Sequence, residues 1–174
     1  MNFKELFRNS HLGLMKVLKR TIHIPVAGVI VENEGKFLLV EEGSDIIPKI
    51  YGKWNFPIGI MKNGENPYRR ALRSGRKETG LFLKINSEVG PSRKKNSYCV
   101  KIGKINMEVH LFWASIIRGV LEVPSDLLGV QFFSLEEIEK LKEEGKLVNH
   151  YILSAIADYQ KLISRRRGNN QGGD

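Results

Sequence analysis

Short stretches in which apolar and polar residues alternate predict several β-strands along this chain. β-branched residues dominate 21–31 and 36–42, and the intervening segment 32–35, Glu-Asn-Glu-Gly, is typical of a tight hairpin turn. We therefore expect these two stretches to pair. The same pattern predicts a second hairpin from 97–102 and 107–117, and further strands at 82–88, 121–123 and 130–133.

One stretch between the strands follows helical spacing. Asn66 is a good N-cap, Pro67 suits the first helical position, and Gly80 supplies the left-handed residue that commonly ends a helix. One face of this helix is expected to be buried and carries Tyr68, Ala71, Leu72, Gly75 and Thr79. The flank facing away from the core carries Arg70, Arg73, Ser74, Lys77 and Glu78.

Two further helices are predicted near the C-terminus. Ser134 and Glu137 form a capping-box pattern, which opens a helix that ends near Glu144. Asn149 caps a last helix with arginines at 165–167. This order of elements predicts an α+β sandwich. We expect a helical N-terminal extension at 1–20, one domain at 21–163, and a basic, disordered tail at 164–174.

The composition is that of a basic globular protein. The 174 residues include 28 Lys and Arg against 19 Asp and Glu, and the net charge of +9 favours polyanionic partners such as RNA or polyphosphate groups. We expect a cytoplasmic location and no membrane partner, because no apolar run could cross a bilayer and no secretory signal is recognisable. The single cysteine, Cys99, excludes an internal disulfide and is expected in the core.

The segment 59–81, GIMKNGENPYRRALRSGRKETGL, resembles the Nudix box, G-x5-E-x7-R-E-U-x-E-E-x-G-U with U aliphatic. The matching positions are Gly59, Glu65, Arg73, Glu78, Gly80 and Leu81. Three positions differ, because Ser74 and Lys77 replace glutamates and Gly75 replaces an aliphatic residue. The preceding segment 54–59 resembles the W-x-x-P-x-G approach to the box, and the resemblance extends over roughly 22–159.

This resemblance implies the Nudix fold, an α/β/α sandwich with a mixed sheet flanked by helices, and a site where glutamates hold Mg2+. In the family, the loop glutamate and the helix arginine, here Glu65 and Arg73, tie the loop to the helix. The formal charge of the three glutamate positions changes from −3 to 0, because Lys77 cancels Glu78. Glu78 is the remaining candidate for metal ligand and general base, and Mg2+ binding is expected to be weak.

Other residues are candidates for completing the site. A family glutamate before a late strand can add a metal ligand, but Gly129 occupies that position here. The candidate substitutes are Asp126, Glu108 and Glu88, which nothing in the sequence places beside Glu78.

Basic side chains are candidate ligand contacts. Lys77 and Arg70 are placed to contact a diphosphate, and a basic loop before Tyr98 could grip a nucleic-acid backbone. That loop contributes Arg93, Lys94 and Lys95. The simpler interpretation, that all of these are solvated surface charges, stays open.

The sequence favours a divergent Nudix domain that binds a nucleoside-diphosphate-linked ligand or RNA, with weak or lost pyrophosphohydrolase activity. One alternative is an active metal-dependent hydrolase of nucleoside diphosphates linked to another group. The other is a protein-interaction subunit that uses the fold as a scaffold. The oligomeric state is not predicted.

Overall fold

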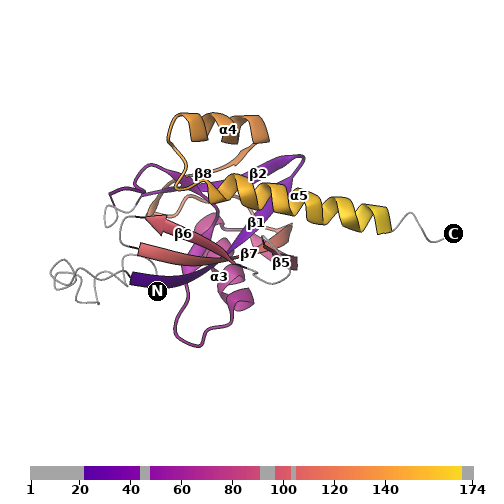
Figure 1. Ribbon diagram of the computed structural model, residues 1–174, viewed down its shortest axis with the longest axis horizontal. Helices are drawn as coiled ribbons and strands as arrows, with labels where there is room; N and C mark the ends of the chain where they lie inside the picture. The colour runs from indigo at the N-terminus through magenta and orange to yellow at the C-terminus, as the bar shows by residue number, and fades with distance from the viewer. Residues whose placement is uncertain (1–21, 44–47, 91–96, 103–104, 170–174) are drawn as a thin grey trace.

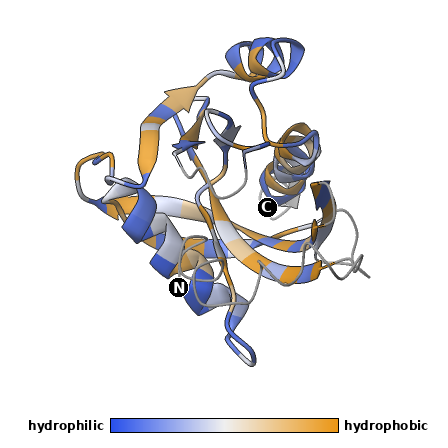
Figure 2. Ribbon diagram, turned by 90° about the vertical axis from the view of Figure 1, so that its left-hand side faces the viewer, coloured by the Kyte–Doolittle hydropathy of each residue, from blue (hydrophilic) through white to orange (hydrophobic). Residues whose placement is uncertain are grey.

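The computed structural model describes residues 22–43, 48–90, 97–102 and 105–169. The elements follow in the order β1 (Ile22–Asn33), β2 (Lys36–Glu42), β3 (Trp54–Asn55), β4 (Ile58–Ile60), α3 (Pro67–Thr79), β5 (Phe82–Val89), β6 (Tyr98–Ile102), β7 (Ile105–Arg118), β8 (Leu127–Phe133), α4 (Leu135–Glu143) and α5 (Tyr151–Asn169). Figures 1 and 2 show α3 and α5 on opposite faces of the sheet. The α/β/α sandwich expected from the sequence is therefore confirmed.

The sheet is mixed, with the strand order β3-β2-β1-β7-β5. Strands β1 and β7 run parallel, from Ile22 opposite Ile105 to Val31 opposite Ala114. The other pairings are antiparallel, including β4 on β1, β6 on β7 and β8 on β2. Both predicted hairpins form, and Gly35 in the first turn has the positive φ of 78° that tight hairpin turns require.

Apolar side chains on the two sides of the sheet form two separate cores. Ile30 on β1 faces a core that includes Ile152 and Ile156 of α5. Its neighbour Val29 points to the other side, as strand geometry requires, and packs in a core with Ala71 of α3. This second core fixes α3, and with it the box residues, against the sheet.

Glycine in the middle of α3 allows this close packing. A Cβ at Gly75 would lie 2.6 Å from Leu83 Cδ1 and 3.0 Å from Val29 Cγ2. The residue that interrupts the aliphatic position of the box therefore brings the helix closer to β1 and β5, at a cost in helix propensity of about 1 kcal/mol relative to alanine.

The predicted helix ends are present. Asn66 Oδ1 accepts a hydrogen bond from the Arg69 amide at the start of α3, and Gly80 is left-handed with φ 76° at its end. Ser134 and Glu137 exchange the two hydrogen bonds of a capping box at the start of α4. Local sequence chemistry therefore sets where both helices begin.

Several expectations about local structure are wrong. No strand forms at 121–123, while the short strands β3 and β4 were not predicted. Helix α5 continues to Asn169, so residues 164–169 are helical rather than disordered. Cys99 is exposed rather than buried, because it lies on the face of β6 that points away from the core. Tyr68 is 43% exposed, although its ring meets Phe112 edge-on.

Three sequence predictions concern residues outside the described ranges: the N-terminal extension at 1–20, the basic loop at 93–95 and the chain end at 170–174. Among the described helices, none is both long and apolar enough to cross a membrane.

Candidate functional site

The loop before α3 is tied to the helix by one glutamate. Glu65 accepts hydrogen bonds from the Lys62 amide, at 2.8 Å, and from the Arg73 guanidinium, at 2.5 Å. Burial acts to raise the pKa of Glu65, but the Lys62 amide and the Arg73 charge outweigh it and lower the pKa. This is the link between loop and helix that the resemblance implied.

Gly59 provides the contact between β4 and α3. A Cβ at this position would lie 2.0 Å from Arg70 Nη2, 2.4 Å from Arg70 Nε and 2.3 Å from Ser74 Oγ. Both side chains are buried, with exposed fractions of 5% and 2%. The expectation that Arg70 and Ser74 lie on the flank facing away from the core is therefore wrong: both lie beneath β4, in the space left by the missing Cβ.

Glu78 lies one turn further along α3 and is half-buried. Its Oε2 accepts a hydrogen bond of 3.1 Å from the amide of Ile58. Burial raises the pKa of the Glu78 carboxyl well above its usual range, and the charge of Glu42 adds to this effect. The positive charge of Arg70 and the Ile58 hydrogen bond act in the opposite direction. Glu78 is therefore engaged by the protein itself.

Lys77, beside Glu78, is exposed at the rim of the site. Its Nζ lies 3.2 Å from Asp126 Oδ2, and half of the lysine side chain is open to solvent. The box position that a glutamate fills in the family thus carries an ammonium group within an ion pair. Because the lysine end of the pair is exposed to solvent, the pair contributes at most about 1 kcal/mol to stability, and Lys77 remains accessible to an anionic ligand.

Glu42, at the end of β2, is the acid that sequence reasoning missed. Its Oε1 accepts a 3.4 Å hydrogen bond from Asn55 Nδ2, and the Tyr151 hydroxyl donates to Asn55 Oδ1. Burial is the main reason why the pKa of Glu42 rises to about 7, with the charge of Asp126 adding to it. In the sequence, only the alternation of residues along β2 could have pointed to the contact between Glu42 and Asn55, which also depends on the register of β2 with β3.

Gly129 has a packing role in β8. It pairs with Glu41 of β2, and a Cβ there would lie 3.0 Å from Trp54 Cη2. A glutamate at this position would need Trp54 to move.

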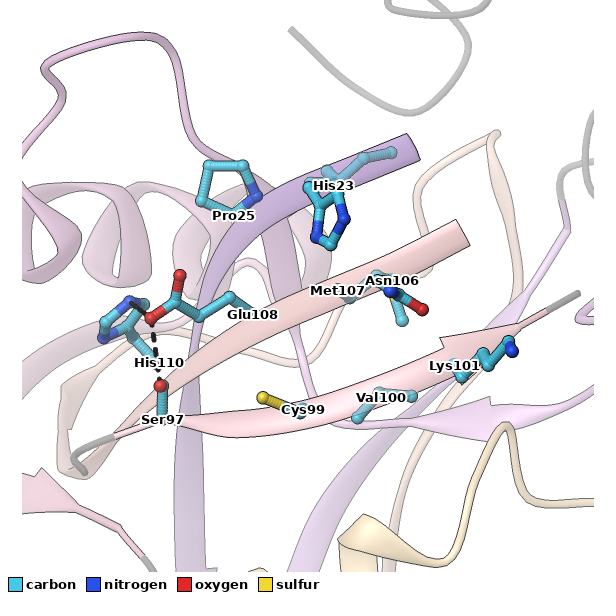
Figure 3. A pocket seen from close by; sticks show the side chains of 11 residues that line it. His23, Pro25, Ser97, Cys99, Val100, Lys101, Asn106, Met107, Glu108 and His110 are labelled. Atoms are coloured by element: carbon cyan, nitrogen blue, oxygen red, sulfur yellow. Dashed lines mark hydrogen bonds and ion pairs between the residues drawn. The ribbon is translucent and has the colours of Figure 1, made fainter. Parts of the chain in front are cut away.

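Two of the three proposed substitute acids form a separate cluster. Glu88 and Glu108 lie 3.8 and 3.6 Å from the ring nitrogens of His110, and Ser97 Oγ donates to Glu108 at 3.0 Å. Figure 3 shows Glu108, Ser97 and Cys99 among the residues that line an open pocket over β1, β6 and β7. Of the three, Asp126 is the acid that joins the box, through Lys77.

Tyr98, which follows the basic loop in the sequence, is buried. Its hydroxyl donates a 2.9 Å hydrogen bond to Asp158 of α5, and its ring packs against Tyr151. The side chain therefore belongs to the core.

The donor set of the box does not fit a Mg2+ centre. Mg2+ prefers carboxylate and water oxygens in octahedral geometry. The positions 74, 77 and 78 offer one hydroxyl, one ammonium and one carboxylate, and the carboxylate already accepts the Ile58 amide. Across the described residues, no three His, Cys, Asp or Glu side chains are grouped so that they could hold a metal ion. The site also carries a buried guanidinium, that of Arg70, which lies with Ser74 against Gly59.

Comparisons with known proteins bear on the fold and the family of this chain. The chain is 26% identical over 128 residues to the ADP-ribose pyrophosphatase of Methanocaldococcus jannaschii, covering 71% of this chain and 69% of that protein. A Nudix hydrolase structure from Nitrosomonas europaea has a TM-score of 0.65 at 20% identity, covering 82% of this chain and 90% of that one. A C. elegans Ap4A hydrolase complex has a TM-score of 0.62 at 15% identity, covering 81% and 98%.

These two structural likenesses show the fold alone, because both identities are low. The family follows from the sequence: the family model described as NUDIX domain matches residues 22–154, which is most of the chain. The chain therefore belongs to the Nudix family.

Proposed function

We propose that this protein is a divergent Nudix domain that binds a nucleoside-diphosphate-linked ligand and hydrolyses it weakly or not at all. Nudix hydrolases generally use divalent metals such as Mg2+, and the box of this chain lacks the carboxylates for one. The observation that carries the proposal is the state of Glu78. Glu78 is the one carboxylate at the three glutamate positions of the box. It accepts a hydrogen bond from the Ile58 amide and is influenced by the charge of Arg70.

Ligand binding is supported by the parts of the site that are kept. The loop glutamate holds α3 through Arg73, and Lys77 presents an accessible ammonium group at the rim. An ammonium group is a good partner for a diphosphate, which carries negative charge on several oxygens. The related M. jannaschii protein is an ADP-ribose pyrophosphatase, so ADP-ribose is a sensible first probe.

The test combines binding and turnover on the full chain. Thermal unfolding is followed with ADP-ribose in the presence of Mg2+ and in EDTA, and hydrolysis is measured by release of AMP. A ligand at 100 times its Kd stabilises by about 2.7 kcal/mol. We expect stabilisation without appreciable AMP. Lys77→Gln should weaken the stabilisation, whereas Lys84→Gln, which removes an exposed lysine on β5, should leave it unchanged.

Two outcomes contradict the proposal. Ordinary turnover that Glu78→Gln abolishes would mean an active hydrolase, with Glu42 and Asp126 as recruited acids. No stabilisation by ADP-ribose, dinucleoside polyphosphates or nucleoside diphosphate sugars would instead favour a protein-interaction subunit built on the same scaffold.

A second candidate function is RNA binding, which a basic surface beside the site favours. The guanidinium groups of Arg76 and Arg118 lie 4.0 and 4.6 Å from the ring centroid of Phe82. Arg73, Arg76 and Lys77 are exposed along the outward side of α3. Basic groups around an aromatic ring suit a single-stranded backbone with a stacked base.

This second function predicts salt-dependent binding. For a short single-stranded RNA, log affinity falls with log salt, and each lost phosphate contact makes this slope less steep by about 0.7. The double variant Arg76→Gln with Arg118→Gln should therefore make the slope less steep by about 1.4. The matched control changes Lys140 and Lys142 of α4 to Gln. An equal slope in all three proteins would exclude this surface as an RNA site.

A further inference from the structure

A buried arginine lies where the box meets β4. Arg70 is 5% exposed, and its Nη2 and Nε are among the three atoms nearest to the position of a Cβ on Gly59. The third is Ser74 Oγ. The guanidinium is thus enclosed between the β4 backbone and the side of α3 that carries two of the three box glutamate positions, 74 and 78.

Ser74 makes room for this group. In the family pattern a glutamate stands at position 74, but the serine here is shorter. Ser74 is 2% exposed, and its Oγ has no hydrogen-bond partner among the described residues. The short side chain and the missing Cβ of Gly59 together leave a polar space under β4, and the guanidinium of Arg70 fills it.

The charge of Arg70 acts on two carboxyls of the site. Burial is the largest single influence on the pKa of both Glu65 and Glu78 and acts to raise it, while the positive charge of Arg70 acts to lower it. The net result is a lowered pKa for Glu65 and a raised pKa for Glu78. A permanently charged guanidinium, unlike an ammonium, does not lose its proton on burial. A fixed cation beside Gly59 and Ser74 therefore acts on both the loop glutamate and the helix glutamate.

We propose that Arg70 is the resident cation of this site, and that its guanidinium takes the place that Mg2+ holds in the box of metal-dependent relatives. Ligand binding at this site then needs no divalent ion. For its ligand, this inference rests on the proposed function above, but the placement of the cation does not. Arg70 acts as a positioning residue: it holds Glu78 and the β4 backbone in place and excludes a metal, while Lys77 meets the ligand.

The first test uses Mn2+ alone, measured by isothermal titration. Ser74→Glu with Lys77→Glu rebuilds the three acids, but Arg70 stays among them and pairs with the new carboxylate at 74. Adding Arg70→Gln removes the cation. We expect the triple variant to bind Mn2+ at least tenfold more tightly than the double variant. Equal affinity of the two would overturn the inference.

A matched control separates a local cation from a general change of charge. Arg69 is the neighbouring arginine, also on α3, but exposed. Arg69→Gln in the double variant changes the net charge by the same amount and should raise the affinity for Mn2+ less than twofold. A gain as large as that from Arg70→Gln would mean that long-range charge, rather than occupation of the site, controls the metal. Circular dichroism checks that each variant folds, and Arg70→Met replaces Arg70→Gln if the latter does not.

The second test uses ADP-ribose and the unmodified protein. If Arg70 replaces the metal, the Kd for ADP-ribose differs less than twofold between EDTA and about 5 mM Mg2+, whatever its absolute value. Binding that requires Mg2+ would refute the resident cation while supporting the ligand. Absence of ADP-ribose binding with the expected Mn2+ results would instead contradict the proposed ligand and leave the resident cation supported.

Discussion

Replacing Gly59 by alanine tests the packing on which the site depends. The added Cβ would lie 2.0 Å from Arg70 Nη2 and 2.3 Å from Ser74 Oγ, whereas ordinary contacts of a Cβ begin at 3.4 Å. One of these groups, or β4 itself, must move by more than 1 Å, as the difference between 3.4 and 2.3 Å shows. Overpacking of this kind typically costs about 1–3 kcal/mol. We expect Gly59→Ala to lower the free energy of unfolding by about 2 kcal/mol.

The cost should depend on Arg70. The guanidinium is the far end of a flexible side chain, so Gly59→Ala is relieved if Arg70 is shortened as well. In a double-mutant cycle with Arg70→Ala, the loss from Gly59→Ala should fall by at least about 1 kcal/mol, the size expected for residues in contact. Urea unfolding of the four proteins measures this. Gly129→Ala replaces Gly59→Ala in a control cycle, because its added Cβ would lie near Trp54, at 3.0 Å from Cη2, rather than near Arg70. Its loss should not depend on Arg70→Ala. Additive losses would show that Arg70 does not pack under Gly59.

Three further predictions concern separate features. The pKa of Glu42 is raised from 4.5 to about 7, so the folded state binds this proton more tightly than the unfolded state, and stability should fall as pH rises from about 4.5 to 7. Glu42→Gln should remove up to ~3 kcal/mol of this fall, and less because the side chain is partly exposed. A difference in stability between wild type and variant that does not change with pH would contradict this. Ser134→Ala should destabilise by about 1 kcal/mol through loss of the capping box. Urea unfolding measures this against Ser154→Ala, which changes an exposed serine of α5; equal effects would contradict the capping role. Tyr98→Phe, which removes the hydrogen bond to Asp158, should cost about 1 kcal/mol in the same assay, and no loss would mean that the bond adds nothing net.

The ends of the helices could be predicted because their chemistry is local. Asn66, Pro67 and Gly80 satisfy or terminate the backbone of α3 with groups a few residues away, and the same holds for the capping box of α4. The two hairpins follow from turn residues between β-branched runs. Such signals need no knowledge of which distant segments will meet.

The interior of the site could not be predicted in this way. A helical projection assigned Arg70 and Ser74 to the flank facing away from the core, because charged and hydroxyl side chains usually face water. What buries them is a glycine on another element, Gly59, whose missing Cβ opens space under β4. Glu42 was missed for a similar reason, since its hydrogen bond from Asn55 depends on how β2 pairs with β3 rather than on any sequence motif.

Cys99 shows the limit of alternation along a strand. The residues of β6 alternate as expected, with Tyr98, Val100 and Ile102 buried. Alternation therefore predicts that Cys99 faces the opposite side from these residues, and a core position for it would need that side of the strand to be covered as well. In the structure that side is open, and Cys99 lines the same surface pocket as Glu108 (Figure 3).

The substitutions in the box are mutually consistent when their charges are counted together. Glu42, Glu78 and Asp126 contribute −3, Arg70 and Lys77 contribute +2, and Ser74 contributes nothing, so these side chains sum to −1 with all three carboxyls ionised. A proton on Glu42 or Glu78, whose pKa values are both raised, brings the sum to zero. With glutamates at 74 and 77, the same set would carry −3 from the box, −2 from Glu42 and Asp126 and +1 from Arg70, a sum of −4 that a divalent ion would have to offset in part. The loss of two acids from the box and the burial of one guanidinium thus both reduce the negative charge that a divalent ion would have to offset. A site of this kind keeps the Nudix scaffold while replacing an exchangeable cation by one that is part of the chain.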